Sequence, residues 1–345
     1  MKSAPPHMGT ASPPSGGEAG PNGGVRKALS ASHLVGLTFF AVCGGDYGIE
    51  DAVGAAGPAW TLAGLLVVPW LWSLPIALMT AELGAMIPDV GGPVIWVDRA
   101  FGSFVAHQNA LVHLVANFFD NALYPVMFAD YLREFHPALQ LEGLPRYLLC
   151  ASMLACVAVL NLLGVDAVAS VSVLFTVLVI SPFAALVVIG LPAVDPGAWL
   201  LGSSTPGGPR WVTFLSILLW NTSGYDSVGA LAGEVENPGR DFPRAMVASI
   251  VLISLVYILP VAVGVSLVEP STLGTWTDGT FALVAKEHVG EWLARWISLG
   301  RPLISVSTLL LTHLTHLTHL TPLTPLTHLI HAPSSIEHRR STTIT

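Results

Sequence analysis

The chain has 345 residues, of which 52% are hydrophobic and only 10% are charged, and its formal net charge is −8. Soluble domains carry about 25% charged residues, so this composition, with a mean hydropathy of +0.66, excludes an ordinary soluble protein. The apolar segments are long and lack a ten-residue alternation, so we expect an all-α integral membrane protein rather than a β-barrel. No basic patch, P-loop, dinucleotide-binding or zinc-finger pattern occurs. We therefore expect the lipid bilayer as surroundings, and no nucleic-acid partner, cofactor, metal or enzymatic activity.

Three regions of different composition divide the chain. Residues 1–30 are rich in Gly, Pro, Ser and Ala, which predicts a disordered cytosolic tail rather than a signal peptide. Residues 31–300 form the membrane domain, with about seven or eight apolar segments close to the roughly 20 residues that span a bilayer. The expected spans are 33–57 (interrupted), 60–86, 103–131, 145–164, 167–192, 211–232 and 244–268, and an eighth begins near Trp292.

Residues 301–345 differ in kind from the membrane domain. Six consecutive triplets of the form Thr-(His or Pro)-Leu run from Thr312 to Leu329. A period of three matches neither the 3.6 residues of a helical turn nor a zinc-finger spacing. We interpret this region as a translated simple repeat, with a metal-binding histidine tract as the alternative. Its histidines are not predicted to be ligands.

The first expected span is interrupted near its middle by Gly44, Gly45 and Gly48, with Asp46 among them and Glu50 and Asp51 just beyond. Each glycine costs roughly 1 kcal/mol of helix stability, and a charge at the bilayer centre costs about 3 kcal/mol or more. Irregular backbone at that depth occurs where it is buried in protein or lines a watery cavity. We therefore predict an unwound segment that forms part of a midplane binding site.

The sixth span contains a second interruption, at residues 220–227, five spans after the first. A broken first helix and a broken sixth helix are what two inverted five-helix repeats would produce. The predicted fold is therefore a five-plus-five inverted-repeat transporter fold, with the second repeat incomplete in this chain.

The third expected span carries a polar stripe at helical spacing. Its members are His113, Asn117, Asp120, Asn121 and Tyr124. This face is expected to meet protein or water rather than lipid, either as a hydrogen-bonded seam between helices or as part of a binding site. A buried carboxylate such as Asp120 needs a positive partner or a proton, and a cationic substrate or a proton is a candidate.

Several ordered segments resemble the amino acid–polyamine–organocation superfamily, and within it the plant and algal polyamine-uptake permeases. The resemblance covers about residues 33–297, and the segments that carry it are 44–58, 80–84, 91–97, 120–126, 226–227, 231–240 and 276–279. It implies a twelve-helix transporter that moves polyamines or amino acids together with protons, in the plasma membrane or an endomembrane. Two departures stand out: Asp46 occupies a position where the family is expected to carry proline, and the expected continuation of helix eight is replaced after Gly300.

The resemblance and the charges together predict the site. Polyamines carry several ammonium groups and no carboxylate, so their site should offer separated carboxylates and aromatic faces. The predicted substrate-binding residues are Gly44, Gly45, Asp46, Tyr47, Gly48, Glu50, Asp51, Asp120, Tyr124, Trp220, Asn221, Gly224, Tyr225 and Asp226. Asp120 and Glu82 are the candidates for proton coupling.

Two other functions remain open. An amino-acid permease of the same fold would also need to hold a carboxylate, for example at a half-helix N-terminus. The chain could also be a truncated membrane protein that does not transport. The surplus of acidic residues favours a small cationic substrate, with a proton as the coupling ion.

Overall fold

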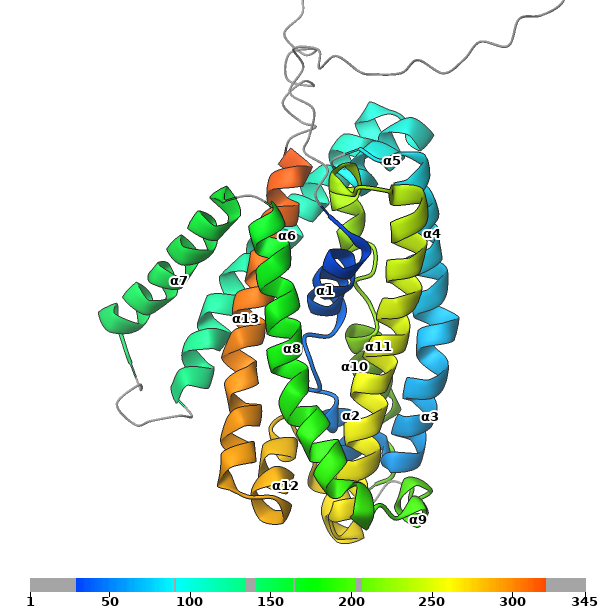
Figure 1. Cartoon of the computed structure of the whole chain (residues 1–345), viewed down its shortest axis with the longest axis vertical. Helices are drawn as coiled ribbons and strands as arrows, with labels where there is room; N and C mark the ends of the chain where they lie inside the picture. The colour runs from blue at the N-terminus through cyan, green and yellow to red at the C-terminus, as the bar shows by residue number, and fades with distance from the viewer. Residues whose placement is uncertain (1–28, 90, 134–140, 164, 203–206, 321–345) are drawn as a thin grey trace, which may run out of the picture.

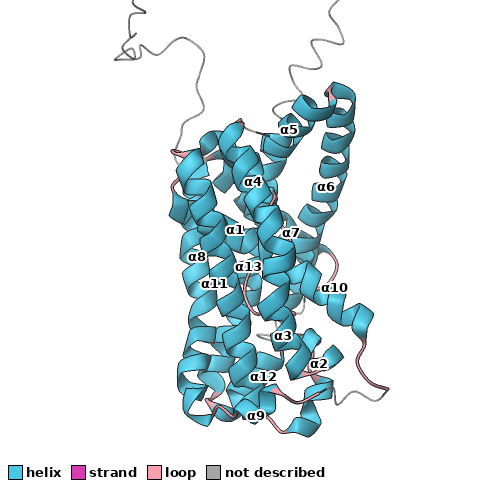
Figure 2. Ribbon diagram, turned by 90° about the vertical axis from the view of Figure 1, so that its right-hand side faces the viewer, coloured by secondary structure: helices cyan, strands magenta, loops and turns pink. Residues whose placement is uncertain are grey.

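The computed structural model describes residues 29–89, 91–133, 141–163, 165–202 and 207–320. They form a bundle of helices joined by short connections (Figure 1), and within these ranges no β-strand occurs. An isolated parallel bridge joins Leu29 to Val235. The prediction of an all-α protein is confirmed, as the second view also shows (Figure 2). Apart from Leu29 and Ser30, the predicted tail at residues 1–30 lies outside the described residues.

Every predicted span corresponds to a helix or a pair of helices. The α-helices are α1 (Ala31–Val42), α2 (Glu50–Ala56), α3 (Pro58–Val68), α4 (Leu74–Met86), α5 (Gly92–Phe101), α6 (Ser103–Arg133), α7 (Leu144–Leu162), α8 (Val165–Gly190), α9 (Pro196–Trp199), α10 (Trp211–Asn221), α11 (Pro238–Leu267), α12 (Thr280–His288) and α13 (Glu291–Leu320). One π-helical turn, η1 (Pro69–Ser73), and three 3₁₀ segments, η3 (Leu191–Ala193), η4 (Ser227–Glu234) and η5 (Pro270–Thr275), complete the secondary structure of the described residues.

Four helical segments within the described ranges are long and apolar enough to cross a membrane: Pro58–Met86, Leu144–Leu162, Ala167–Ala193 and Pro238–Leu267. α1 and α10 are apolar but shorter, because each ends at one of the two interruptions. α6 and α13 are also long helices. They carry some of the polar side chains of the cavity described below, among them Asn117 on α6 and Arg301 on α13.

α1 lies inside the bundle, between α8, α11 and α13 (Figure 1). Its buried face is apolar and includes Leu34, Leu37 and Phe39. At Gly36 the helix approaches α8 so closely that a Cβ atom would lie 2.9 Å from Val173 Cγ2. On either side of this centre, α4 packs against α11, and α6 packs against α13. The unwound end of α1 is therefore held inside protein, not at the surface of the bundle.

The π-helical turn η1 begins at one proline and is followed by another. Pro69 has no N–H to donate to the preceding turn, and single π-helical turns inside α-helices are frequent at functional sites. The helix continues as α4 at Leu74, and Pro75 also lacks an N–H. The predicted second span is thus one bulged helical segment, and the bulge faces the second interruption.

α13 continues through Gly300 without a break and ends at Leu320. Its backbone therefore includes the first three Thr-His-Leu triplets, although the side chains of residues 312–320 and all of residues 321–345 lie outside the described part. A backbone helix does not require its side chains to repeat every 3.6 residues, so the period of three did not exclude helix here. The boundary at residue 300 and the inverted-repeat arrangement stay predictions.

Candidate functional site

The predicted interruption of the first span is confirmed. α1 ends at Val42, and the amides of Cys43 and Gly44 both donate to the Phe39 carbonyl. Residues 43–49 then leave the helical conformation, and Gly44, Gly45 and Gly48 adopt φ values of 64°, 122° and 84°. Glycine adopts such φ values without a steric penalty. The three glycines therefore allow the backbone to leave the helix here, whereas larger residues at these positions would be strained.

The interruption of the sixth span is confirmed as well, and it lies beside the first. α10 ends at Asn221, residues 222–226 are not helical, and the chain resumes as η4. Gly224 has a φ of 107° and packs against the backbone of α1, where an added Cβ would clash with the Ala41 carbonyl oxygen. From the π-helical turn, Ser73 Oγ donates to the Thr222 carbonyl at 2.6 Å and Trp72 Nε1 donates to Ser223 Oγ at 3.1 Å.

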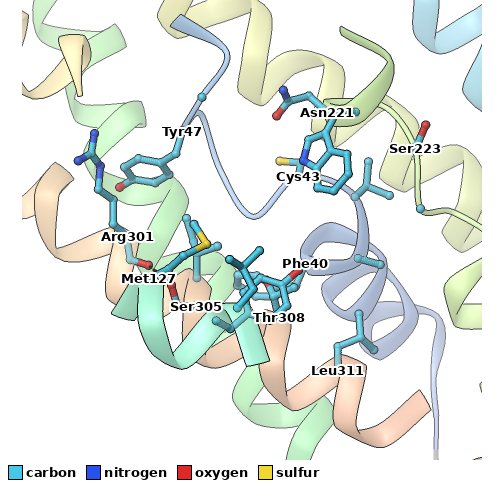
Figure 3. Close-up of a pocket in the computed structure, with 18 of the residues that line it drawn as sticks. Phe40, Cys43, Tyr47, Met127, Asn221, Ser223, Arg301, Ser305, Thr308 and Leu311 are labelled. Carbon is cyan, nitrogen blue, oxygen red and sulfur yellow. Dashed lines mark hydrogen bonds between the residues drawn. The ribbon is translucent and has the colours of Figure 1, made fainter. Parts of the chain in front are cut away.

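A cavity of about 560 Å³ opens where the two interruptions meet α6 and α13. Figure 3 shows Tyr47 beside Arg301 at one side of this cavity, with Asn221 at the end of α10 and Ser223 of the second interruption at the other. Half of the predicted site residues line it: Tyr47, Gly48, Asp51, Tyr124, Trp220, Asn221 and Gly224.

The polar stripe of the third span contributes to the same cavity. Asn117 and Tyr124 on α6 line it, and the Asn121 side chain donates to the Asn117 carbonyl at 2.7 Å. This face therefore meets protein and a cavity, as its spacing predicted. The Asp120 side chain is not among those that the structure describes, and its role stays a prediction.

The remaining predicted residues lie outside the cavity lining. Gly44 and Gly45 pack against Ile304 and Val179. Tyr225 is buried in the core, whereas Asp226 and the proton-coupling candidate Glu82 are exposed. A direct substrate contact for these residues stays a prediction.

The three acidic residues in and just after the first interruption have different environments. Glu50 is fully buried, and its two oxygens accept from the amides of Gly48 at 2.8 Å and Gly279 at 3.2 Å. Asp51 accepts from the Asp278 amide at 3.2 Å and also lines the cavity. Asp46 is fully buried, and neither carboxyl oxygen has a hydrogen-bond partner in the structure. Only Asp51 among these three offers charge to the cavity directly.

Arg301 on α13 is a cavity residue that the sequence analysis missed. It is only 7% exposed, and its guanidinium donates to Asp278 Oδ1 at 3.0 Å. The guanidinium carbon lies 5.8 Å from the Tyr47 ring centre and 5.5 Å from that of Tyr131. The signal in the sequence is an arginine inside an apolar run, but the triplet repeat that follows obscures it.

Comparison with known proteins identifies the family. Residues 28–312 match the amino acid permease family. The chain belongs to this family. The match extends past Gly300 and includes Arg301. Membership of the amino acid permease family, together with the apolar helices, makes this a multi-pass membrane protein.

Relatives in this family include proteins named as polyamine transporters. A probable polyamine transporter of Arabidopsis thaliana is 41% identical over 273 residues, which is 79% of this chain and 54% of the relative. A polyamine transporter of Oryza sativa subsp. japonica is 40% identical over 284 residues, 82% of this chain and 53% of the relative. A cadaverine/lysine antiporter of Escherichia coli is 24% identical over 245 residues, 69% of this chain and 54% of the relative. The chain spans about half the length of these relatives.

Proposed function

We propose that this chain carries the substrate site of a permease that imports polyamines such as putrescine and spermidine by proton symport. The observation that carries the proposal is the cavity between the two interruptions, which combines carboxylates with aromatic faces. Asp51 and Asp278 supply negative charge, while Tyr47, Tyr124 and Trp220 supply rings. Ammonium groups bind to both kinds of surface, and free backbone at a broken helix allows a ligand to approach closely.

The relatives support the same substrate class. Two proteins about 40% identical to this chain are named as polyamine transporters, and a more distant relative is named as a cadaverine/lysine antiporter. All three names concern basic amines. We propose the plasma membrane as the location, which suits uptake from outside the cell.

Proton coupling needs a carboxyl group that can exchange its proton as the substrate charge arrives. Asp120 on α6 and Glu82 on α4 remain the candidates from the sequence. The structure supports Asp46 as a third candidate. Its carboxyl group is fully buried and accepts no hydrogen bond, so the ionised form is energetically costly and a bound proton is favoured. Asp46 also lies in the unwound segment that would move with the substrate.

Binding of labelled spermidine to the purified chain in lipid nanodiscs tests the substrate. We expect saturable binding, and we expect Asp51→Asn to weaken it about tenfold, since a lost charge contact of this kind corresponds to roughly 1.4 kcal/mol. The matched control is Glu287→Gln, which removes an exposed carboxylate on α12 outside the cavity. Folded protein that binds no polyamine would reject the proposal, and equal affinities for the wild type and Asp51→Asn would remove Asp51 from the site.

One observation favours the amino-acid alternative specifically. Arg301 places a guanidinium in the cavity, and this group suits a substrate carboxylate. If arginine or leucine competes for the site and spermidine does not, the substrate is an amino acid and that alternative is established. Uptake into transport-deficient cells then separates a transporter from a protein that binds but does not transport.

A further inference from the structure

Arg301 contacts the kinds of side chain to which an ammonium substrate would bind. It pairs with the carboxylate of Asp278, and it lies over the rings of Tyr47 and Tyr131. These are the two kinds of contact, charge and cation–π, on which the polyamine proposal depends. The guanidinium therefore already fills part of the binding surface.

The surrounding chain is shaped to hold this guanidinium. Gly279 leaves room for it, because a Cβ at that position would lie 2.7 Å from one of its nitrogens. Gly300 leaves room for the Tyr47 hydroxyl, which donates to the Ile297 carbonyl and fixes the ring beside Arg301. The Asp278 amide is itself held by Asp51. Elements from both ends of the described chain thus converge on one cation.

We propose that Arg301 is a specificity-determining residue: a tethered cation that competes with substrate ammonium groups and limits how many of them the cavity accepts. The inference rests on the proposed polyamine site. Among the described lining residues, the formally charged groups are Asp51, Asp278 and Arg301, and the charges of these three groups sum to −1. Replacing Arg301 with a neutral residue changes this to −2.

This charge count predicts a graded effect. A substrate with more ammonium groups gains more from the second unneutralised carboxylate than a monoamine does. Removal of Arg301 should therefore tighten binding most for spermine, less for spermidine and putrescine, and least for butylamine. A general loss of structure would weaken all four amines together, so the gradation separates a specificity role from a structural one.

The test uses the full chain in nanodiscs and measures competition of these four amines against labelled spermidine. We expect Arg301→Met to tighten spermine about tenfold and butylamine about twofold or less, and we expect Arg301→Lys to stay near the wild type because it keeps the charge. Arg295→Met is the matched control. Arg295 lies on the same helix but is exposed and pairs with Glu291 at 3.4 Å, so its replacement should change no affinity.

A second variant covers the case in which Arg301→Met does not fold. Arg301→Gln also removes the charge but keeps an amide N–H that can donate to Asp278, the present partner of the guanidinium. Its affinities should follow the order expected for Arg301→Met, with the largest gain for spermine.

The outcomes separate the two proposals. If polyamines bind with the same affinity to the wild type and to the neutral Arg301 variants, the role of Arg301 is overturned and the polyamine site stays intact. Loss of arginine or leucine binding on Arg301→Met, with polyamine affinities unchanged, also overturns it and assigns the guanidinium to a substrate carboxylate. Folded variants and wild type that bind none of the amines reject the polyamine site itself, and this inference with it.

Discussion

The first interruption spans residues 43–49 and contains three glycines with positive φ, whereas the second spans residues 222–226 and contains one. The first is held by the helix that follows it, since Glu50 of α2 accepts from the Gly48 amide, and by α13, since the Tyr47 hydroxyl donates to the Ile297 carbonyl. At the second, Ser73 of the π-helical turn donates to the Thr222 carbonyl. The two breaks are therefore supported by different neighbours: α2 and α13 in one case, and the π-helical turn in the other.

The glycines show what this difference means for the site. An added Cβ at Gly48 would meet no atom within 4 Å, whereas one at Gly224 would clash with the Ala41 carbonyl oxygen. Both residues line the cavity. Gly48 thus belongs to an open surface that a ligand can approach, and Gly224 belongs to a packing joint between the two interruptions.

The largest expected effect comes from replacing these two glycines with alanine. Both changes carry the cost of a positive φ, about 1–2 kcal/mol. Gly224→Ala adds a backbone clash worth about 1–3 kcal/mol, so it should be clearly less stable than Gly48→Ala. Melting temperatures of the two variants, purified side by side in the same detergent, measure the difference. Equal melting temperatures would contradict the assignment of Gly48 to an open surface and of Gly224 to a packing joint.

A smaller effect is expected from the two fully buried acids Asp46, in the first interruption, and Glu50, just after it. Glu50→Gln replaces one acceptor oxygen with an NH₂ group that faces a donor amide, at a cost of about 1–3 kcal/mol. Asp46→Asn loses no hydrogen bond, because neither Asp46 oxygen has a partner, and it should cost under about 1 kcal/mol. Thermal unfolding of both variants checks this order. A larger loss for Asp46→Asn would mean that the Asp46 carboxylate is charged and paired in the folded protein.

The helices and both interruptions could be predicted from the sequence, because glycines and acids are costly in the middle of an apolar membrane helix. Which acids face the cavity could not be predicted in the same way. Glu50 and Asp51 are neighbours, yet only Asp51 lines the cavity, because successive helical side chains point about 100° apart and packing sets the rotation of α2. Arg301 is hard to recognise for a different reason: the repeat that follows it makes the sequence after Gly300 atypical of a membrane helix, although α13 continues through it.

The smallest expected effect tests the outside support of the second interruption. Ser73→Ala removes the hydroxyl that donates to the Thr222 carbonyl and should cost about 1 kcal/mol. Ser181→Ala is the matched control, because the Ser181 hydroxyl donates to the Leu178 carbonyl within its own helix. Hydrogen exchange followed by mass spectrometry locates the change. If Ser73→Ala speeds exchange only at residues 222–226, the π-helical turn stabilises the second interruption and not the first. Equal acceleration at residues 43–49 would mean that the two interruptions open as one unit.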